Sequence, residues 1–147
     1  NNKADVNAWL VSTLPAIIND KILKKSTEWA SILAEELDYV GTMCVEFFID
    51  RNDNLYVNEI APRVHNSGHL TINAYNVSQF ENHIRSVCGL ERINTKKLYN
   101  AKMINLIGSD IESYRNKKLN DNEFFYDYKK AEIRKKRKMG HLTIIEK

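Results

Sequence analysis

The sequence predicts an α+β protein, because segments with helical periodicity alternate with short runs typical of strands. Apolar residues recur at helical spacing over Asp20–Leu37, and a second helical segment follows Ser78. Two runs rich in Val, Phe, Tyr and Ile, Thr42–Asp50 and Leu55–Ile60, flank the turn-forming sequence Arg51–Asn54, which is the pattern of a β-hairpin. The 147 residues suffice for one ordinary domain with a small addition.

The composition is that of a soluble globular protein, with 43% hydrophobic and 28% charged residues. No run approaches the roughly 18 apolar residues of a membrane helix, and no signal-peptide pattern opens the chain. Cys44 and Cys88 lack metal-type spacing and lie among apolar residues, so we expect two buried, reduced thiols. These features predict a cytoplasmic protein without a membrane partner.

The first helix is expected to begin at Asn19 or Asp20, either of which can act as N-cap, and to end near Leu37 or Asp38. Within Asn1–Ile18, the sequence NAWLVSTLPAII (Asn7–Ile18) is interpreted as a strand leading into a loop at Pro15. The helix has one face at helical spacing, formed by Ile22, Leu23, Ser26, Ala30, Leu33, Ala34 and Leu37. We expect this helix to be structural.

The hairpin predicts two facing carboxylates. Loops of four and of two residues give the same register, with Glu46 opposite Glu59 and with Phe48 and Val57 as the next residues on that face. Like charges about 5 Å apart at an effective dielectric near 20 repel by roughly 3 kcal/mol, which destabilises the strand pair. Water, a shared proton or a cation such as Mg²⁺ can relieve this repulsion, so a solvated pair and a metal site both stay open. A bulge in the hairpin would remove the argument.

The segment Leu55–Leu70 is dense in donors and acceptors at the end of the second strand. It carries Asn58, Glu59, Arg63, His65, Asn66, Ser67 and His69. One interpretation is a polar turn that satisfies its own backbone. The other is a functional loop in which Arg63 supplies a fixed cation and His65 a titratable donor. The spacing of His65 and His69 would suit a metal only on a helix, which Asn-Ser-Gly disfavours.

The next segments complete the first domain, predicted to span residues 1–98. Thr71–Ala74 is expected to be a short strand or turn. Ser78–Glu81 is a capping box that begins a helix running to about Cys88, burying Phe80, Ile84 and Val87 and stopping at Gly89. The polar connection Leu90–Asn100 is the predicted boundary.

The second domain, residues 99–147, is expected to be small and rich in strands. The pattern predicts one short helix and three strands, at Ile111–Lys118 and at Lys102–Ile107, Phe124–Tyr128 and His141–Ile145. We expect so small a unit to be unable to bury a core alone.

Seven of the 22 Lys and Arg residues fall within Lys129–Lys138, although the net charge is only +3. A solvated face, a nucleic-acid-binding patch and a phosphate site for a small ligand are all compatible with this density. The sequence Met139-Gly140-His141, leading into a strand, favours a folded site over a disordered tail.

Two motifs carry a family resemblance. VNEIAPRVHNSGH, at Val57–His69, resembles the signature of the 5-(carboxyamino)imidazole ribonucleotide synthases, ATP-grasp enzymes of purine biosynthesis. The C-terminal segment resembles that family's ending, YGK-x-E-x-R-P-G-R-K-M-G-H. It departs at Lys129, where the family has Gly, and at Lys135–Lys136, where the family has Pro-Gly, which puts the turn conformation in question but not the charge. The resemblance extends from about Pro15 to the end and includes VEFF at Val45–Phe48 and SQFENHIRSVCGL at Ser78–Leu90.

This resemblance implies the C-terminal part of an ATP-grasp domain followed by a small β-rich C-terminal domain. It implies a fragment, inactive alone, that lacks the N-terminal part of its own chain and whose parent is commonly a homodimer. The parent would use ATP, with Mg²⁺ or Mn²⁺, and bicarbonate to form carboxyphosphate and to carboxylate 5-aminoimidazole ribonucleotide in the synthesis of IMP.

The resemblance also assigns roles to single residues. Glu46 and Glu59 would hold the metal between the β- and γ-phosphates, with Asn58 beside the nucleotide. Arg63 and His65 would be catalytic and contact the bicarbonate-derived group and the amine, in a pocket shaped by Asn66 and Ser67. Lys130 and Arg137 would bind the 5′-phosphate of the ribonucleotide.

Two alternatives remain. Another ATP-grasp carboxylase or ligase would keep the paired carboxylates without the two motifs. A non-enzymatic nucleic-acid-binding domain would explain the basic segment but not Glu46 opposite Glu59.

Overall fold

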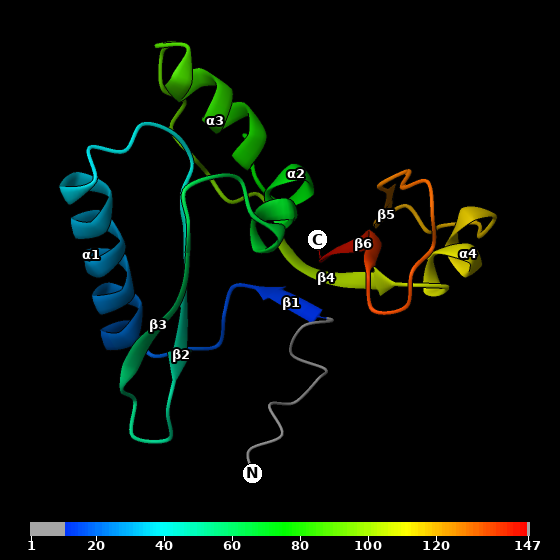
Figure 1. Cartoon of the computed structure of the whole chain (residues 1–147), viewed down its shortest axis with the longest axis horizontal. Coiled ribbons are helices and arrows are strands. Elements are labelled where there is room, and N and C mark those ends of the chain that lie inside the picture. Colours follow the sequence, from blue (N-terminus) through cyan, green and yellow to red (C-terminus); the bar gives the residue numbers. More distant parts are fainter. Residues whose placement is uncertain (1–10, 147) are drawn as a thin grey trace. The chain divides into compact units, whose positions relative to one another are not determined.

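The structure, a computed structural model, describes residues 11–146 and contains two compact units that interleave along the chain. We call residues 16–72 and 77–96 the hairpin unit, and residues 11–15, 73–76 and 97–146 the sheet unit (Figure 1). Each is described by itself. The predicted division at residue 98 stays a prediction, since the units exchange short segments on both sides of it.

The hairpin unit combines helices with a two-stranded sheet, confirming the α+β class. Its elements are α1 (Asp20–Glu36), β2 (Cys44–Ile49), β3 (Leu55–Ala61), the 3₁₀-helix η2 (Asn66–Leu70), α2 (Thr71–Ala74, which passes into the sheet unit) and α3 (Gln79–Val87). Helix α1 begins as predicted, because the Asn19 side chain accepts a hydrogen bond from the Ile22 N–H at 2.9 Å. Of its expected apolar face Ile22 is buried, whereas Leu23 and Leu37 are exposed.

The hairpin pairs Glu46 with Glu59 as predicted, but its loop and register differ from the prediction. Its loop is one residue longer than expected, so Ile49 pairs with Leu55 and Phe47 with Val57. The expected grouping of Phe48 with Val57 is therefore wrong. A β-bulge at Asn58 then takes up the extra residue and restores Glu46 opposite Glu59. The bulge thus preserves the carboxylate pair that it was expected to destroy.

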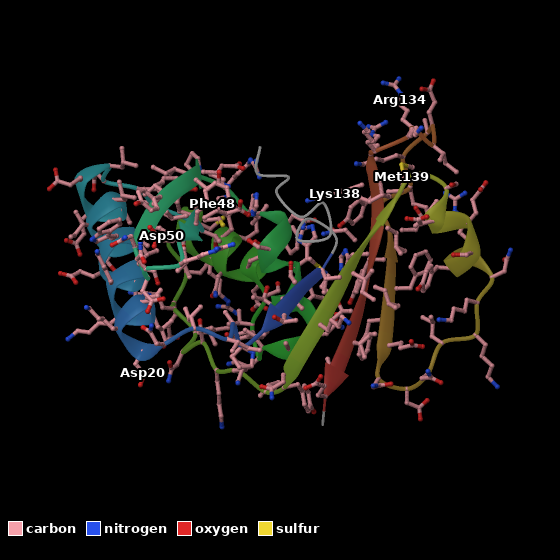
Figure 2. The ribbon with its side chains drawn as sticks, turned by 90° about the horizontal axis from the view of Figure 1, so that it is seen from below. Asp20, Phe48, Asp50, Arg134, Lys138 and Met139 are labelled. Atoms are coloured by element: carbon pink, nitrogen blue, oxygen red, sulfur yellow. The ribbon has the colours of Figure 1, made fainter. Side chains whose placement is uncertain are left out.

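The loop itself is held by one carboxylate. Asp50 accepts hydrogen bonds from the backbone N–H groups of Asn52 and Asn54 at 2.8 and 2.9 Å, and from the Asn54 side chain at 2.9 Å. These bonds, with the Asn54 side chain as the largest cause, lower the pKa of Asp50. Asp50 and Phe48 are labelled on this hairpin in Figure 2.

The segment after β3 is helical, so the strand or turn expected at Thr71–Ala74 is wrong. The Thr71 hydroxyl connects two turns, donating to the Gly68 carbonyl at 2.5 Å and accepting from the Gln79 N–H at 2.8 Å. Since η2 and α2 are short and local, side-chain bonds of this kind decide their conformation.

Helix α3 begins at the predicted cap, since the Ser78 hydroxyl accepts from the Glu81 N–H at 3.2 Å. Its predicted burial is wrong: Phe80, Ile84 and Val87 are all exposed, and the buried position is Gln79. The buried side of α3 is therefore polar at its start, and the side chains at apolar spacing point away from it.

The sheet unit is a four-stranded antiparallel sheet in the order β1-β4-β6-β5. Its elements are β1 (Val11–Leu14), β4 (Asn100–Ile107), α4 (Asp110–Arg115), β5 (Glu123–Asp127) and β6 (Lys138–Glu146). The strand predicted before Pro15 is confirmed for residues 11–14, while the earlier part of that prediction lies outside the described residues. The predicted helix and three strands are all present.

This unit buries a core of its own, so the expectation that it could not is wrong. Leu106, Ile111 and Met139 form a buried cluster against Tyr114 and Phe125. These residues come from β4, α4, β5 and β6, and full burial of such a side chain is worth about 1.5–3 kcal/mol. Among residues 11–146, no helix is long and apolar enough to cross a membrane.

Candidate functional site

The two facing carboxylates lie on one face of the hairpin. Alternation along β2 turns Phe47 toward α1, where its ring centroid lies 6.2 Å from that of Trp29, and turns Glu46 to the opposite face. The bulge brings Asn58 to the Glu46 carboxylate, to which its side-chain amide donates at 3.3 Å. Glu46 and Glu59 are both partly exposed, so neither bears the full cost of burying a charge.

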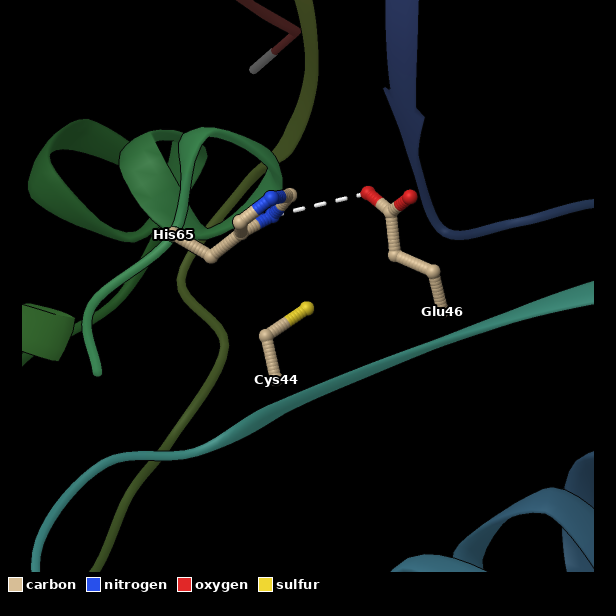
Figure 3. Close-up of side chains that lie close together, drawn as sticks. All are labelled: Cys44, Glu46 and His65. Carbon is tan, nitrogen blue, oxygen red and sulfur yellow. Dashed lines mark ion pairs between the residues drawn. The ribbon is translucent and has the colours of Figure 1, made fainter. Parts of the chain in front are cut away.

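His65 reaches both carboxylates. Its Nδ1 lies 3.5 Å from Glu46 Oε1 (Figure 3), and its Nε2 lies 3.9 Å from Glu59 Oε1. Nδ1 accepts from the Ser67 N–H at 3.4 Å, a contact that favours the tautomer with its proton on Nε2, which faces Glu59. Arg63 adds a cation 3.8 Å from the same Glu59 oxygen. The chain's own donors therefore offset part of the predicted repulsion.

The backbone of His65 is held by a residue that sequence reasoning missed. Gln79 is only 6% exposed, accepts from the His65 N–H at 2.9 Å and donates to the His65 carbonyl at 2.8 Å. The Gln79 amide also contacts His69 Nδ1 at 2.8 Å. An amide just after an N-cap is too common to have signalled this role.

Gly68 is required where η2 passes this amide. A Cβ at Gly68 would lie 2.2 Å from Gln79 Oε1, so the close approach depends on the missing side chain. His69 turns toward α3, where its ring stacks on Phe80 at 5.5 Å, and not toward the carboxylates. His65 and His69 thus form no metal pair.

Ser67 and Cys44 line the same site. Ser67 Oγ lies 3.0 Å from His65 Nδ1 and 3.4 Å from Cys44 Sγ. Burial raises the pKa of the Cys44 thiol, while the Ser67 hydrogen bond acts in the opposite direction. Cys44, His65 and Ser67 belong to the lining of a cavity of about 430 Å³. Asn66 is half-buried at the start of η2, and its pocket role stays a prediction.

Both cysteines are free, as predicted, but the prediction that both are buried is wrong. Cys44 is half-buried, whereas Cys88 is exposed. Cys88 caps the end of α3, beside the equally exposed Val87, so apolar neighbours in sequence did not imply a buried position.

The basic segment forms the loop between β5 and β6 in the sheet unit. Figure 2 labels Arg134 in this loop and Lys138 and Met139 at the start of β6. Lys129 and Lys136, which replace the family's two glycines, have positive φ angles of 51° and 67°. The turn conformation that the departures put in question therefore remains glycine-like, at a cost of about 1–2 kcal/mol for each left-handed residue.

The cations of this loop are not equivalent. Arg134 pairs with Glu132 at 2.7 Å and Lys129 with Asp127 at 3.6 Å. Lys130 turns inward, donating to the Lys138 carbonyl at 2.5 Å, and burial, followed by the charges of Arg137 and Lys138, lowers its pKa. The loop is therefore a folded structure with internal pairing.

Arg137 differs from its neighbours. Its backbone is fixed, because its N–H donates to the Arg134 carbonyl at 3.0 Å and its carbonyl accepts from the Gly108 N–H at 2.9 Å. Its side chain is exposed and forms no ion pair within the described part of the chain. A guanidinium on a fixed backbone suits an anionic ligand.

Behind the loop, Tyr128 supports Lys130. The Tyr128 hydroxyl lies 2.8 Å from His141 Nδ1, and the Lys130 Nζ lies 5.4 Å from the Tyr128 ring centroid. Burial raises the pKa of Tyr128 to about 12, so this phenol is neutral at physiological pH.

Comparison with known proteins gives a consistent result. The N5-carboxyaminoimidazole ribonucleotide synthase of Bacillus subtilis is 42% identical over 141 residues, covering 95% of this chain and 37% of the relative. A solved ADP complex of an N5-carboxyaminoimidazole ribonucleotide synthetase superposes with a TM-score of 0.87 at 39% identity, covering 93% of this chain and 37% of that one. The structure of the Aspergillus clavatus enzyme with ADP and 5-aminoimidazole ribonucleotide superposes with a TM-score of 0.85 at 30% identity. This match covers 93% of this chain and 39% of that one.

The chain thus spans little more than a third of the length of these relatives. Residues 1–80 match the ATP-grasp domain, and residues 101–147 match the phosphoribosylaminoimidazole carboxylase C-terminal domain. Both matches follow the order that the two motifs predicted. The chain therefore belongs to the ATP-grasp family, and its C-terminal part matches the phosphoribosylaminoimidazole carboxylase C-terminal domain.

Proposed function

We propose that this chain is the C-terminal part of an enzyme that uses ATP and bicarbonate to carboxylate the amino group of 5-aminoimidazole ribonucleotide. The observation that carries the proposal is the group formed by Glu46, Asn58, Glu59 and His65, which lies inside the ATP-grasp match. Solved relatives that hold ADP and 5-aminoimidazole ribonucleotide support both ligands. A cytoplasmic, homodimeric parent enzyme belongs to the same proposal.

The donor set fits Mg²⁺. The two carboxylates face each other, and their contacts with Asn58, His65 and Arg63 are 3.3–3.9 Å long. Charge-assisted hydrogen bonds are about 2.7–2.9 Å, so the oxygens keep capacity for a hard cation. Glu46 and Glu59 would hold Mg²⁺ or Mn²⁺, which neutralises phosphate oxygens during phosphoryl transfer.

Arg63 and His65 would act as donors on the side of the site where the amino group of the ribonucleotide reacts. His65 presents an N–H at Nε2, and its backbone is held on both sides by Gln79. Arg63 supplies a permanent positive charge near the same carboxylate. Such fixed donors stabilise negative charge that develops in a transition state, because they need no reorganisation. Ser67 orients the imidazole from Nδ1.

Lys130 and Arg137 would bind the 5′-phosphate of the ribonucleotide. Arg137 is exposed on a fixed backbone, and Lys130 supplies a second positive charge from within the same loop. The nucleic-acid alternative is less favoured, because Glu132 and Asp127 pair with two of the loop's seven cations.

The deciding experiment measures phosphate release from ATP by the complete enzyme, with and without 5-aminoimidazole ribonucleotide and bicarbonate. Stimulation by the ribonucleotide, with bicarbonate-dependent carboxylated product, is the expected result. Hydrolysis indifferent to the ribonucleotide would redirect the assignment to another ATP-grasp ligase. A folded enzyme without hydrolysis would overturn the proposal.

A further inference from the structure

We propose that Cys44, Glu46 and His65 form a binding site for a borderline-soft divalent cation such as Zn²⁺, which shares Glu46 with the magnesium site and blocks it. The thiol, carboxylate oxygen and imidazole nitrogen come from two elements of the hairpin unit and converge on one point (Figure 3). A set of one sulfur, one nitrogen and one oxygen ligand is unsuited to Mg²⁺ but suits Zn²⁺.

The nitrogen–oxygen distance matches tetrahedral coordination. The three ligand atoms all lie within 4.8 Å of one another, and His65 Nδ1 is 3.5 Å from Glu46 Oε1. Zinc bonds of about 2.0–2.2 Å to nitrogen and oxygen at tetrahedral angles place these two ligands about 3.4 Å apart. For a thiolate bond of about 2.3 Å the corresponding separation is about 3.6 Å, so Cys44 Sγ needs to move by at most about 1.3 Å.

The ligands are positioned before any ion binds. Cys44 and Glu46 are two residues apart on β2 and so share a face, and the bulge comes only after Glu46. The His65 backbone is held by the two Gln79 hydrogen bonds. The backbones that carry the three ligands are therefore fixed before an ion binds.

The surroundings of the ligands are those of a metal centre. A metal-bound histidine usually donates its other ring N–H to a carboxylate, and His65 Nε2 faces Glu59 Oε1 at 3.9 Å. The free oxygen of Glu46 accepts from Asn58, and Ser67 Oγ lies between the thiol and the imidazole. The lone pair of Nδ1 and the Glu46 oxygen, both acceptors, lie 3.5 Å apart, which attracts a cation.

Occupancy by zinc removes a carboxylate from the proposed reaction. Glu46 becomes a zinc ligand and is unavailable to Mg²⁺, while His65 is held by zinc at Nδ1. Thiolate and imidazole ligands favour zinc strongly over magnesium, so an excess of Mg²⁺ does not displace the zinc. This inhibitory consequence rests on the proposed function, whereas the binding site itself does not.

The binding test uses Co²⁺ as a spectroscopic probe of the complete, nucleotide-free enzyme. We expect stoichiometric absorption from thiolate-to-cobalt charge transfer, displaced by Zn²⁺. Cys44→Ala and the near-isosteric Cys44→Ser should each bind Co²⁺ at least about a hundredfold more weakly, since loss of an outer partner alone costs about 10–100-fold. Cys88→Ala, which removes the exposed free thiol, is the matched control and should keep the band. A wild type without the band, or a band that survives Cys44→Ala, overturns the site.

The inhibition test titrates Zn²⁺ into ribonucleotide-dependent ATP hydrolysis in excess Mg²⁺, with each variant normalised to its own rate without zinc. Cys44→Ala should need at least about tenfold more Zn²⁺ for half-inhibition, and a chelator should restore wild-type activity. Equal zinc sensitivity of wild type and Cys44→Ala would overturn the overlap of the two sites. If the enzyme shows the cobalt band but no ribonucleotide-dependent ATP hydrolysis, only the proposed function is overturned. If it shows this hydrolysis but no cobalt band, only the zinc site is overturned.

Discussion

The sheet unit and the hairpin unit are stabilised in different ways. In the sheet unit Met103, Ile111, Met139 and Leu142 are at most 1% exposed, so apolar packing defines the positions of its strands. In the hairpin unit the key positions are instead set by polar contacts, such as those of Gln79 with His65 and of Asp50 with its turn. The geometry of the candidate site in the hairpin unit therefore depends on hydrogen bonds, although this unit also buries Ile22, Leu55 and Leu70.

This comparison predicts that the largest effect on turnover comes from a residue with little effect on stability. In the complete enzyme, Glu59→Gln should lower the rate by about 10³-fold, or about 4 kcal/mol, because it removes a carboxylate from the proposed magnesium site. Its unfolding midpoint should stay near that of wild type, since Glu59 is partly exposed. Glu35→Gln on α1 is the control, and wild-type activity of Glu59→Gln would refute the metal role.

The converse prediction concerns two isoleucines. Ile111→Ala should lower the free energy of unfolding by about 2–5 kcal/mol, because it opens a cavity in the sheet-unit core. The same change at Ile84, which is 56% exposed, should stay within about 0.5 kcal/mol. Denaturant unfolding measures both, and equal losses would abolish the contrast between the units.

The two hydrogen bonds between the Gln79 side chain and the His65 backbone form a polar clamp, and breaking it should lower both stability and turnover. Gln79→Glu keeps the acceptor for the His65 N–H but puts an oxygen opposite the His65 carbonyl. We expect a loss of about 1–3 kcal/mol of stability from the broken hydrogen bond. Turnover should also fall about tenfold, as for an outer partner of a site residue. Unfolding and steady-state kinetics measured together test this, and a stability loss without a rate effect would make the clamp purely structural.

The basic loop offers a matched pair of arginines. Arg137→Ala should raise the KM for the ribonucleotide about tenfold, because an exposed guanidinium that binds phosphate is worth about 1.5–3 kcal/mol. Arg134→Ala should change KM little, since Glu132 already neutralises that side chain. An unchanged KM in Arg137→Ala would remove its phosphate role.

The smallest expected effect has opposite signs at adjacent residues. Lys136→Gly should stabilise the sheet unit by about 1 kcal/mol, because Lys136 has a left-handed φ of 67° that glycine adopts freely. Lys135→Gly, where φ is not positive, should destabilise it by about 0.5–1 kcal/mol through added chain entropy. Thermal unfolding compares the two variants. If both changes destabilise the protein, Lys136 does not have the backbone strain that its left-handed φ implies.

Local rules accounted for most of the elements. The caps at Asn19 and Ser78 were predictable because each is decided by neighbours within three residues. The strands of both units followed from composition and turn residues. The hairpin register predicted the facing carboxylates, and the charge distribution predicted the basic loop. The pairing of Glu46 with Glu59 came out correctly only because an unpredicted longer loop and an unpredicted bulge cancelled.

The sequence by itself determined the α+β class, the caps, the succession of strands and the family, because these depend on short-range preferences and on motifs. Only the tertiary structure decided that Asn58 bulges toward Glu46, that Gln79 holds His65, that Cys44 joins the site and that α3 exposes its apolar residues. These features depend on which surfaces meet after folding. Contacts between residues distant in sequence are set by packing, and periodicity within one segment does not encode them.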